Sequence, residues 1–342
     1  MMDWTDRHCR YFHRLITQRT RLYTEMVTTG ALLNGNVPRH LDFDATEHPL
    51  ALQLGGSEPE DLAACARLAQ DWGYDEVNLN CGCPSERVQR GTFGACLMNE
   101  AALVRDCVRA MRDALGDALP VTVKHRIGID RSESYEFMRD FVGTVAEGGC
   151  TVFIVHARNA WLKGLSPKDN REIPPLRYEL VHRLKRDFPA LCIVINGGFT
   201  RNAAIAEQLA VLDGVMVGRQ AYHDPARMAS WDASLWCQHG PEQPPMDTDP
   251  GDDWRLQIEH RMVTYLARLG SVPWSHASRH MLGLWHGRPG ARRWRQVWSD
   301  HRMKTLPPAE VQRLATAARL QGGATVEPAA APRHDPVAAQ IT

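Results

Sequence analysis

Residues 78–85 have the sequence Asn78-Leu79-Asn80-Cys81-Gly82-Cys83-Pro84-Ser85, and this segment decides how the fold is predicted. It continues the short apolar run that starts at Asp75, and a glycine and a proline close it. This pattern is typical of a buried strand that ends in a loop. Gly82 lets the backbone approach a ligand closely. The thiol of Cys83 can serve as a nucleophile, a proton donor or a metal ligand, and the segment alone leaves these roles open.

The length and composition indicate a soluble globular protein. The 342 residues suffice for one barrel domain of roughly 200–250 residues and a smaller second domain. The hydrophobic content of 44% and the charged content of 23% are ordinary for such proteins. No apolar run approaches the ~18 residues that span a membrane, and the polar start of the chain does not resemble a signal peptide.

Cysteine content and charge narrow the class further. Nine cysteines spread over a long chain argue against a disulfide framework and favour the reducing cytoplasm. The net charge of zero argues against a generally basic nucleic-acid binder. Residues 276–304 are an exception, because they hold seven Arg or Lys residues and one Asp, a local balance of +6.

Apolar runs alternate with helical patterns along the first two thirds of the chain. Strands are predicted at residues 22–27, 49–54, 75–79, 121–125, 151–156, 192–196 and 214–217. Helices are predicted with N-caps at Thr5, Ser57 and Asn99, and further helices at 135–147, 178–188 and 202–212. Continuous apolar strands separated by helices predict an α/β fold with a covered parallel sheet. About seven such units predict a (β/α)8 TIM barrel, whose eighth strand we expect upstream of Met1.

The pattern changes after about residue 230, and three parts are predicted. Residues 1–230 form the predicted catalytic barrel. A segment rich in Pro, Asp and Gly then leads to helical patterns, so residues 231–320 are predicted to form a small all-helical domain. Residues 321–342 are aperiodic and rich in Ala, Pro and Gly, which predicts a disordered tail.

Polar residues collect at the predicted strand ends, which meet on one face of a barrel. They are Gln53, Lys124, His156 and Asn196, together with the pairs Gly197-Gly198 and Gly218-Arg219. A single glycine pair would be an ordinary turn. Two pairs on the last two strands, with an arginine, favour a phosphate site.

Two of these side chains are open to more than one interpretation, and a third suits a flavin. Lys124 is either a strand-end lysine paired with a carboxylate or a cation opposite a cofactor atom that becomes negative, as flavin N1 does on reduction. His156 alone would be a satisfied core histidine, but its neighbours favour a role in the site. Gln53 offers the donor and the acceptor that match the edge of a flavin ring.

A metal site is the alternative for the cysteines. Cys81, Cys83 and Cys96 lack the C-x2-C spacing of structural zinc, and no ligand-spaced pair of histidines accompanies them. We therefore predict no metal. Cys81 occupies an apolar strand position and is expected to pack in the core, whereas Cys83 lies in the loop.

Residues 276–304 combine basic side chains with tryptophans. The cluster contains Arg279, His280, Arg288, Arg292, Arg293 and Arg295, interleaved with Trp285, Trp294 and Trp298. A charge run is usually a solvated face, but this composition is also typical of an RNA-contacting surface, where arginines contact phosphates and aromatic rings stack on bases. A second basic loop, 163–171, follows His156 on the same barrel face. Two basic surfaces beside one site favour a polyanionic substrate.

The segment 78–85 extends into the pattern N-L-N-x-G-C-P-S-x-R-V-Q-x-G-x-F-G-A-C-L, which resembles the signature of tRNA-dihydrouridine synthases. Other segments agree with this family, namely residues 1–7, 53–56, 123–126, 156–158, 165–176, 196–198, 218–219 and 279–284. Residues 170–176 and 279–284 are similar to its bacterial DusA-type subfamily. The resemblance covers essentially residues 1–305.

The resemblance implies an FMN-dependent barrel and a helical domain that clamps tRNA, in an enzyme that uses NADPH. Such enzymes reduce the C5–C6 bond of a D-loop uridine, at position 20 and often 20a in this subfamily. Reduced FMN would deliver hydride to C6, and Cys83 would protonate C5 from the opposite face. The uridine must leave its stack to fit between them. Neither a membrane nor a protein partner is implied.

The resemblance also assigns residues to roles. FMN would be held by Met1, Met2, Gln53, Lys124, His156, Asn196, Gly197, Gly198, Gly218 and Arg219. Asn80 would contact the uracil. Contacts to the D-loop and elbow region of tRNA are expected from Lys168, Arg171, Arg292 and Arg295.

The chain departs from the family pattern at two places. Family members have a strand ending in Ala-Pro before Met-Met-Asp, so we expect a strand upstream of Met1, and Cys81 replaces an aliphatic residue. Two other functions are weighed against the family. An FMN oxidoreductase acting on a free pyrimidine would not need the Arg/Trp-rich segment. An RNA-binding module without catalysis would not need Cys83, Lys124 and His156 together.

Overall fold

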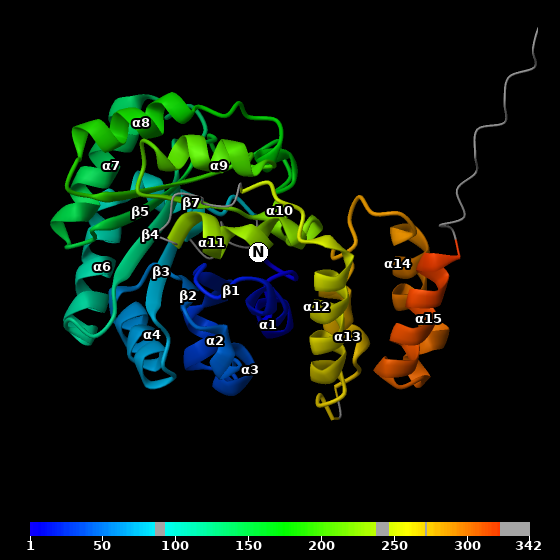
Figure 1. Ribbon diagram of the computed structural model, residues 1–342. Helices are drawn as coiled ribbons and strands as arrows, with labels where there is room; N and C mark the ends of the chain where they lie inside the picture. The colour runs from blue at the N-terminus through cyan, green and yellow to red at the C-terminus, as the bar shows by residue number, and fades with distance from the viewer. Residues whose placement is uncertain (86–92, 237–245, 271, 322–342) are drawn as a thin grey trace, which may run out of the picture.

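The computed structural model describes residues 1–85, 93–236, 246–270 and 272–321 (Figure 1). Seven strands form one parallel sheet in the order of the sequence. They are β1 Leu22–Thr28, β2 Leu50–Gly55, β3 Glu76–Cys81, β4 Val121–Arg126, β5 Val152–His156, β6 Cys192–Asn196 and β7 Gly214–Met216. The seven strands predicted within residues 22–217 are therefore all present. Of the predicted disordered tail, residues 321–342, all but Gln321 lie outside the described residues.

Helices surround the sheet and continue beside it (Figure 1). Those of the first two thirds are α1 Arg7–Ile16, α2 Thr29–Leu33, α3 Val37–Leu41, α4 Pro59–Asp71, α6 Ala101–Leu115, α7 Tyr135–Glu147, α8 Tyr178–Asp187, α9 Asn202–Leu209 and α10 Arg219–His223. Those that follow are α11 Trp231–Trp236, α12 Gly251–Leu266, α13 Ser275–Ser278, α14 Ala291–Ser299 and α15 Pro308–Leu320. No helix in the described ranges is long and apolar enough to cross a bilayer.

The sheet curves into most of a barrel. Each strand pairs in parallel with the next, from β1 to β7, and no pairing between β7 and β1 is found within the described part of the chain. The six residues of β3 are all buried, as expected for a strand covered on both faces. The predicted TIM-barrel class, followed by helices, is confirmed.

Strand register brings the predicted site residues to one edge of the sheet. Asn80 lies opposite Lys124, Arg126 opposite His156, and His156 opposite Asn196. Because parallel strands all end at the same edge, these side chains share the C-terminal mouth of the barrel.

All three predicted N-caps were wrong by one residue. Asp6, not Thr5, caps α1, and its carboxylate accepts hydrogen bonds from the backbone N–H groups of His8 and Cys9. The N-caps of α4 and α6 are Glu58 and Glu100, and neither makes a side-chain capping bond. These two helices are therefore held in place by their buried faces rather than by Ser57 or Asn99.

The helices α12 to α15 form the helical part of the molecule, and the tryptophans of residues 276–304 lie in its core. The expectation that these tryptophans stack on RNA bases is therefore wrong. The indoles of Trp285, Trp294 and Trp298 all donate hydrogen bonds to the carboxylate of Glu259 on α12, at 3.2, 2.9 and 3.2 Å. None of the three is more than 3% exposed, and Glu259 is fully buried. The three indole rings therefore fill the core, and their N–H groups supply hydrogen bonds to the buried carboxylate.

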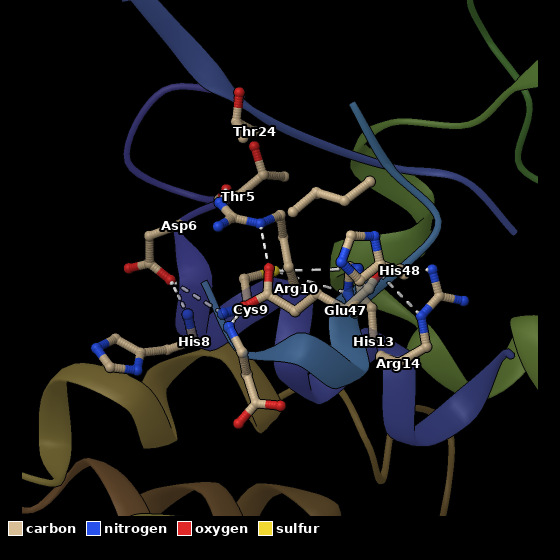
Figure 2. Close-up of polar contacts among 12 residues, drawn as sticks. Thr5, Asp6, His8, Cys9, Arg10, His13, Arg14, Thr24, Glu47 and His48 are labelled. Atoms are coloured by element: carbon tan, nitrogen blue, oxygen red, sulfur yellow. Dashed lines mark hydrogen bonds and ion pairs between the residues drawn. The ribbon is translucent and has the colours of Figure 1, made fainter. Parts of the chain in front are cut away.

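The first helix connects the barrel with the helical part (Figure 1). Figure 2 shows its polar contacts: Asp6 caps the helix, and Arg10 donates to the carboxylate of Glu47 at 2.6 Å. Arg14 bonds the carbonyl oxygen of Glu47 at 2.9 Å. Both arginines and Glu47 are buried, so this ion pair anchors α1 within the protein. The predicted domain boundary at residue 230 stays a prediction.

Candidate active site

A tight turn after β3 presents the thiol of Cys83. The side-chain oxygen of Asn80 accepts hydrogen bonds from the backbone N–H groups of Gly82 and Cys83, both at 3.0 Å. Its amide nitrogen donates to Oε1 of Gln53 at 2.9 Å. Asn80 therefore joins β2 to the turn and fixes the thiol.

The two thiols of this segment differ in accessibility. Cys83 is half-buried, with its Sγ 3.5 Å from Oγ of Ser85. Cys81 is fully buried, and burial raises the pKa of its thiol well above the ordinary value. Cys83 is therefore the thiol that a substrate can reach.

Lys124 follows on β4 with a cation that has no carboxylate partner within the described part of the chain. Among the described residues, none forms a hydrogen bond or an ion pair with its ammonium group. Burial, and then the charge of Arg126, lowers the pKa of Lys124 to about 8, while Cys83 raises it. Since it remains largely protonated at neutral pH, the ammonium is available to an anionic group. The alternative of a lysine paired with a carboxylate is wrong.

His156 ends β5 with an unsatisfied buried nitrogen. Its Nδ1 has no hydrogen-bond partner among the described residues. Burial, followed by the charges of Arg126 and Lys124, holds the pKa of His156 well below its ordinary value, so the imidazole is neutral at pH 7. A buried nitrogen without a partner costs free energy, which a ligand group would recover.

The glycine pair after β6 leaves no room for side chains. Gly197 and Gly198 have φ angles of +118° and +77°. A Cβ on Gly197 would lie 3.1 Å from the ring of His156, and one on Gly198 would lie 2.4 Å from Leu176. Tyr178 donates to the carbonyl of Gly197 at 2.5 Å. Backbone in this conformation presents N–H groups to an anion.

The other phosphate candidates lie around β6 and β7. The side-chain amide of Asn196 donates a hydrogen bond to the carbonyl oxygen of Met216 at 2.8 Å, so it links β6 to β7. Gly218 is the residue before α10, and a Cβ there would lie 3.6 Å from the sulfur of Met1. Arg219 pairs with Glu172 at 2.6 Å. The first methionine thus lies beside the second glycine element, while Met2 is 52% exposed.

Arg126 joins two loops of the mouth, those after β3 and β5, and was missed from the sequence. Its guanidinium donates to the carbonyls of Gly82 at 2.9 Å, Asn159 at 3.0 Å and Asn170 at 2.9 Å. It is only 4% exposed, and burial lowers its pKa to about 10. One signal was available: Arg126 lies two residues after Lys124 on the same strand, so both side chains point to the same face.

Asn170 organises the loop after β5 and was also missed. Its side chain bonds both the N–H and the carbonyl of Trp161, at 2.7 and 2.8 Å, and it is fully buried. The loop thereby presents Lys168 and Arg171 as exposed cations at the mouth. No sequence pattern distinguishes such an asparagine from a solvent-exposed one.

Two predicted tRNA contacts lie elsewhere. Arg292 and Arg295 are exposed on α14, in the helical part that stands beside the barrel (Figure 1). The structure thus brings together the thiol, the unpaired cation and the glycine elements, and leaves these arginines on a separate surface. No group of three potential metal ligands occurs among the residues that the structure describes.

These features define a class: a barrel enzyme with a fixed thiol facing a cationic, glycine-lined mouth that suits a phosphate-bearing cofactor. A profile described as "Dihydrouridine synthase (Dus)" matches residues 1–319. The chain belongs to this family of enzymes, as the sequence resemblance predicted.

Curated relatives agree with this assignment over nearly the whole chain. The tRNA-dihydrouridine(20/20a) synthase of Yersinia pestis is 54% identical over 305 residues, which cover 89% of this chain and 85% of that protein. The protein of the same name from Pseudomonas aeruginosa is 55% identical over 311 residues, 91% of each chain. A solved structure of a 2-naphthoyl-CoA reductase complex aligns with a TM-score of 0.51 at 11% identity, over 66% of this chain and 46% of that one. That likeness supports the fold alone.

Proposed function

We propose that this protein reduces uridine to 5,6-dihydrouridine in the D-loop of tRNA, at positions 20 and 20a, with FMN as cofactor and NADPH as reductant. The observation that carries the proposal is the juxtaposition of the Asn80-fixed Cys83 turn with the unpaired ammonium of Lys124 on the neighbouring strand. The relatives named tRNA-dihydrouridine(20/20a) synthase support tRNA as the substrate. Reduced cysteines and NADPH point to the cytoplasm.

The residues of the mouth fit a flavin with a phosphate. The orphaned Nδ1 of His156 and the ammonium of Lys124 offer partners to polar ring atoms. The backbone at Gly197, Gly198 and Gly218, with Arg219, suits the phosphate. The full proposed set is Met1, Met2, Gln53, Lys124, His156, Asn196, Gly197, Gly198, Gly218 and Arg219.

Cys83 performs the acid step. When bound, reduced FMN supplies a hydride to C6 of the uracil. The Cys83 thiol gives its proton to C5, which completes the saturation of the C5–C6 bond and leaves a thiolate. A proton from solvent then restores the thiol. Asn80 keeps the thiol in place and contacts the base.

Cations on two surfaces bind the tRNA. Lys168 and Arg171 lie at the mouth, where the flipped uridine enters, and Arg292 and Arg295 lie on α14. Exposed cations that contact phosphates contribute affinity without reading sequence. The helical part therefore supplies binding, and the barrel supplies chemistry.

The test is dihydrouridine mapping of tRNA from a deletion strain complemented with wild type or with Cys83→Ala. We expect the wild type to restore dihydrouridine at 20 and 20a and Cys83→Ala to leave it almost absent, since general acid catalysis contributes about 10²–10⁴-fold. Cys192→Ala is the matched control. Cys192 is also a half-buried thiol, but it is the first residue of β6 and so lies at the end of the barrel opposite the mouth. Normal dihydrouridine with Cys83→Ala would exclude the proton-donor role. A purified wild type without a flavin absorbance band would contradict the cofactor.

A further inference from the structure

Residues 280–286 of the helical part pack against the end of α10. Nδ1 of His280 lies 3.2 Å from the hydroxyl of Tyr222, and the two rings meet edge to face with centroids 5.8 Å apart. His280 is completely buried. Asp224, the residue after α10, lies 3.5 Å from Nδ1 of His286.

Gly283 makes the closest approach in this contact. A Cβ at Gly283 would lie 2.6 Å from the carbonyl oxygen of His223 and 2.9 Å from that of Tyr222. These are backbone atoms that cannot rotate away, so only glycine permits the observed packing. The close fit means that the position of this segment and the position of α10 depend on each other.

The start of the chain also packs against α10. Trp4 stacks on Tyr222 with centroids 4.6 Å apart and contacts His223 edge to face at 5.1 Å. Asp6, two residues further on, lies 2.9 Å from Nε2 of His280. The end of α10 therefore contacts both the start of the chain and residues 280–286.

The other end of α10 carries the second glycine element of the proposed cofactor site. Gly218 precedes the helix and Arg219 is its first residue. Since α10 has only five residues, we expect a shift at Tyr222 or His223 to move Arg219 as well. A misplacement of about 1 Å suffices to weaken a preorganised site.

We propose that residues 280–286 form a positioning element for the cofactor phosphate, acting through α10 on Gly218 and Arg219. The inference rests on the proposed function, because it requires a phosphate-bearing flavin at the mouth. It gives the helical part a second role besides binding tRNA.

The test measures the affinity of the full-length protein, freed of flavin, for FMN and for riboflavin, which lacks the phosphate. The added methyl of Gly283→Ala pushes the segment away from α10. We expect this variant to bind FMN about tenfold more weakly and riboflavin as the wild type does. Gly30→Ala is the matched control, since a Cβ there meets nothing within 4 Å, and it should bind both flavins normally.

Tyr222→Phe provides a second variant that adds no atoms and removes only the contact with His280. Its FMN affinity should fall about threefold with riboflavin affinity unchanged, even if Gly283→Ala does not fold. The inference is overturned if Tyr222→Phe leaves both affinities unchanged or weakens them by the same factor. A wild type that binds neither flavin, or that does not prefer FMN, would instead refute the proposed function.

Discussion

Lys124 holds a positive charge inside the mouth of the barrel without a carboxylate among the described residues. Its pKa falls from 10.5 to about 8, mainly through burial. Below pH 8 the lysine is charged in both the folded and the unfolded protein. The free-energy cost of burying its charge is then at its maximum. Between pH 8 and 10.5 the unfolded chain binds more protons, so stability rises with pH. The charged ammonium of Lys124 therefore lowers the free energy of unfolding, and the site retains it nevertheless.

Replacing this lysine should therefore stabilise the protein and impair its function. We expect Lys124→Met to raise the melting temperature of the flavin-free protein by roughly 2–6 °C at pH 7, with the difference shrinking as the pH rises from 8 to 10.5. Its affinity for FMN should fall. Thermal unfolding at pH 7 and pH 10 checks the first two points.

The matched control is Lys185→Met. Lys185 pairs with Asp213 at 2.8 Å and bonds two backbone carbonyls, so its removal should not stabilise the protein. A lower melting temperature for Lys124→Met at pH 7 would mean that the ammonium stabilises the fold.

At the scale of elements, α12 and α14 are joined through Glu259. Its carboxylate accepts three indole N–H groups, and burial is the main reason for its raised pKa. We expect Glu259→Gln to lower the free energy of unfolding by about 1–3 kcal/mol, because an amide cannot accept all three donors and its NH2 group opposes one of them. Thermal or denaturant unfolding followed by tryptophan fluorescence measures this.

Glu310→Gln is the control for that substitution. Glu310 forms an exposed pair with Arg313 on α15, and its loss should change stability by no more than about 0.5 kcal/mol. Equal effects of the two substitutions would show that the indole bonds to Glu259 contribute nothing specific.

The elements also show what can be predicted from sequence. The seven strands follow from apolar runs such as 192–196, and the glycines at 197 and 198 were recognisable because such pairs end strands. Helix starts were missed by one residue each, since Ser57 and Asn99 are good caps in general but Pro59 and the buried faces decide the start here.

Contacts between distant segments could not be predicted. Arg126 donates hydrogen bonds to carbonyl oxygens 33 and 44 residues away in the sequence. A pattern of hydrophobic residues carries no information on such bonds. The tryptophans beside arginines suggested RNA stacking, but composition cannot show which side of a helix is buried. In the structure, the arginines at 292 and 295 are exposed and Trp294 between them is not.

At the scale of the whole molecule, the proposed chemistry and the proposed tRNA binding occupy different parts. Arg292→Glu and Arg295→Glu should each weaken tRNA binding at least about tenfold at low salt and reduce its salt dependence. NADPH oxidation without tRNA should stay normal, because α14 lies beside the barrel rather than at its mouth (Figure 1). Filter binding at several salt concentrations and the flavin reduction rate measure the two effects.

Arg139→Glu controls for net charge in that experiment. Arg139 is on α7, across the barrel from the helical part (Figure 1), so its reversal should leave tRNA affinity nearly unchanged. Equal losses for all three variants would indicate a general electrostatic effect. Loss of NADPH oxidation in the α14 variants would indicate misfolding.

Asp6 has a consequence for how the molecule holds together. The same carboxylate caps the first helix of the barrel and binds Arg279 and His280 of the helical part. These partners hold its pKa well below the ordinary range, against the opposing effect of burial. The cap lies within residues 6–9, whereas the contact with Arg279 and His280 forms only when the helical part is folded. A substitution of this one carboxylate therefore removes the N-cap of α1 and a contact with the helical part at the same time.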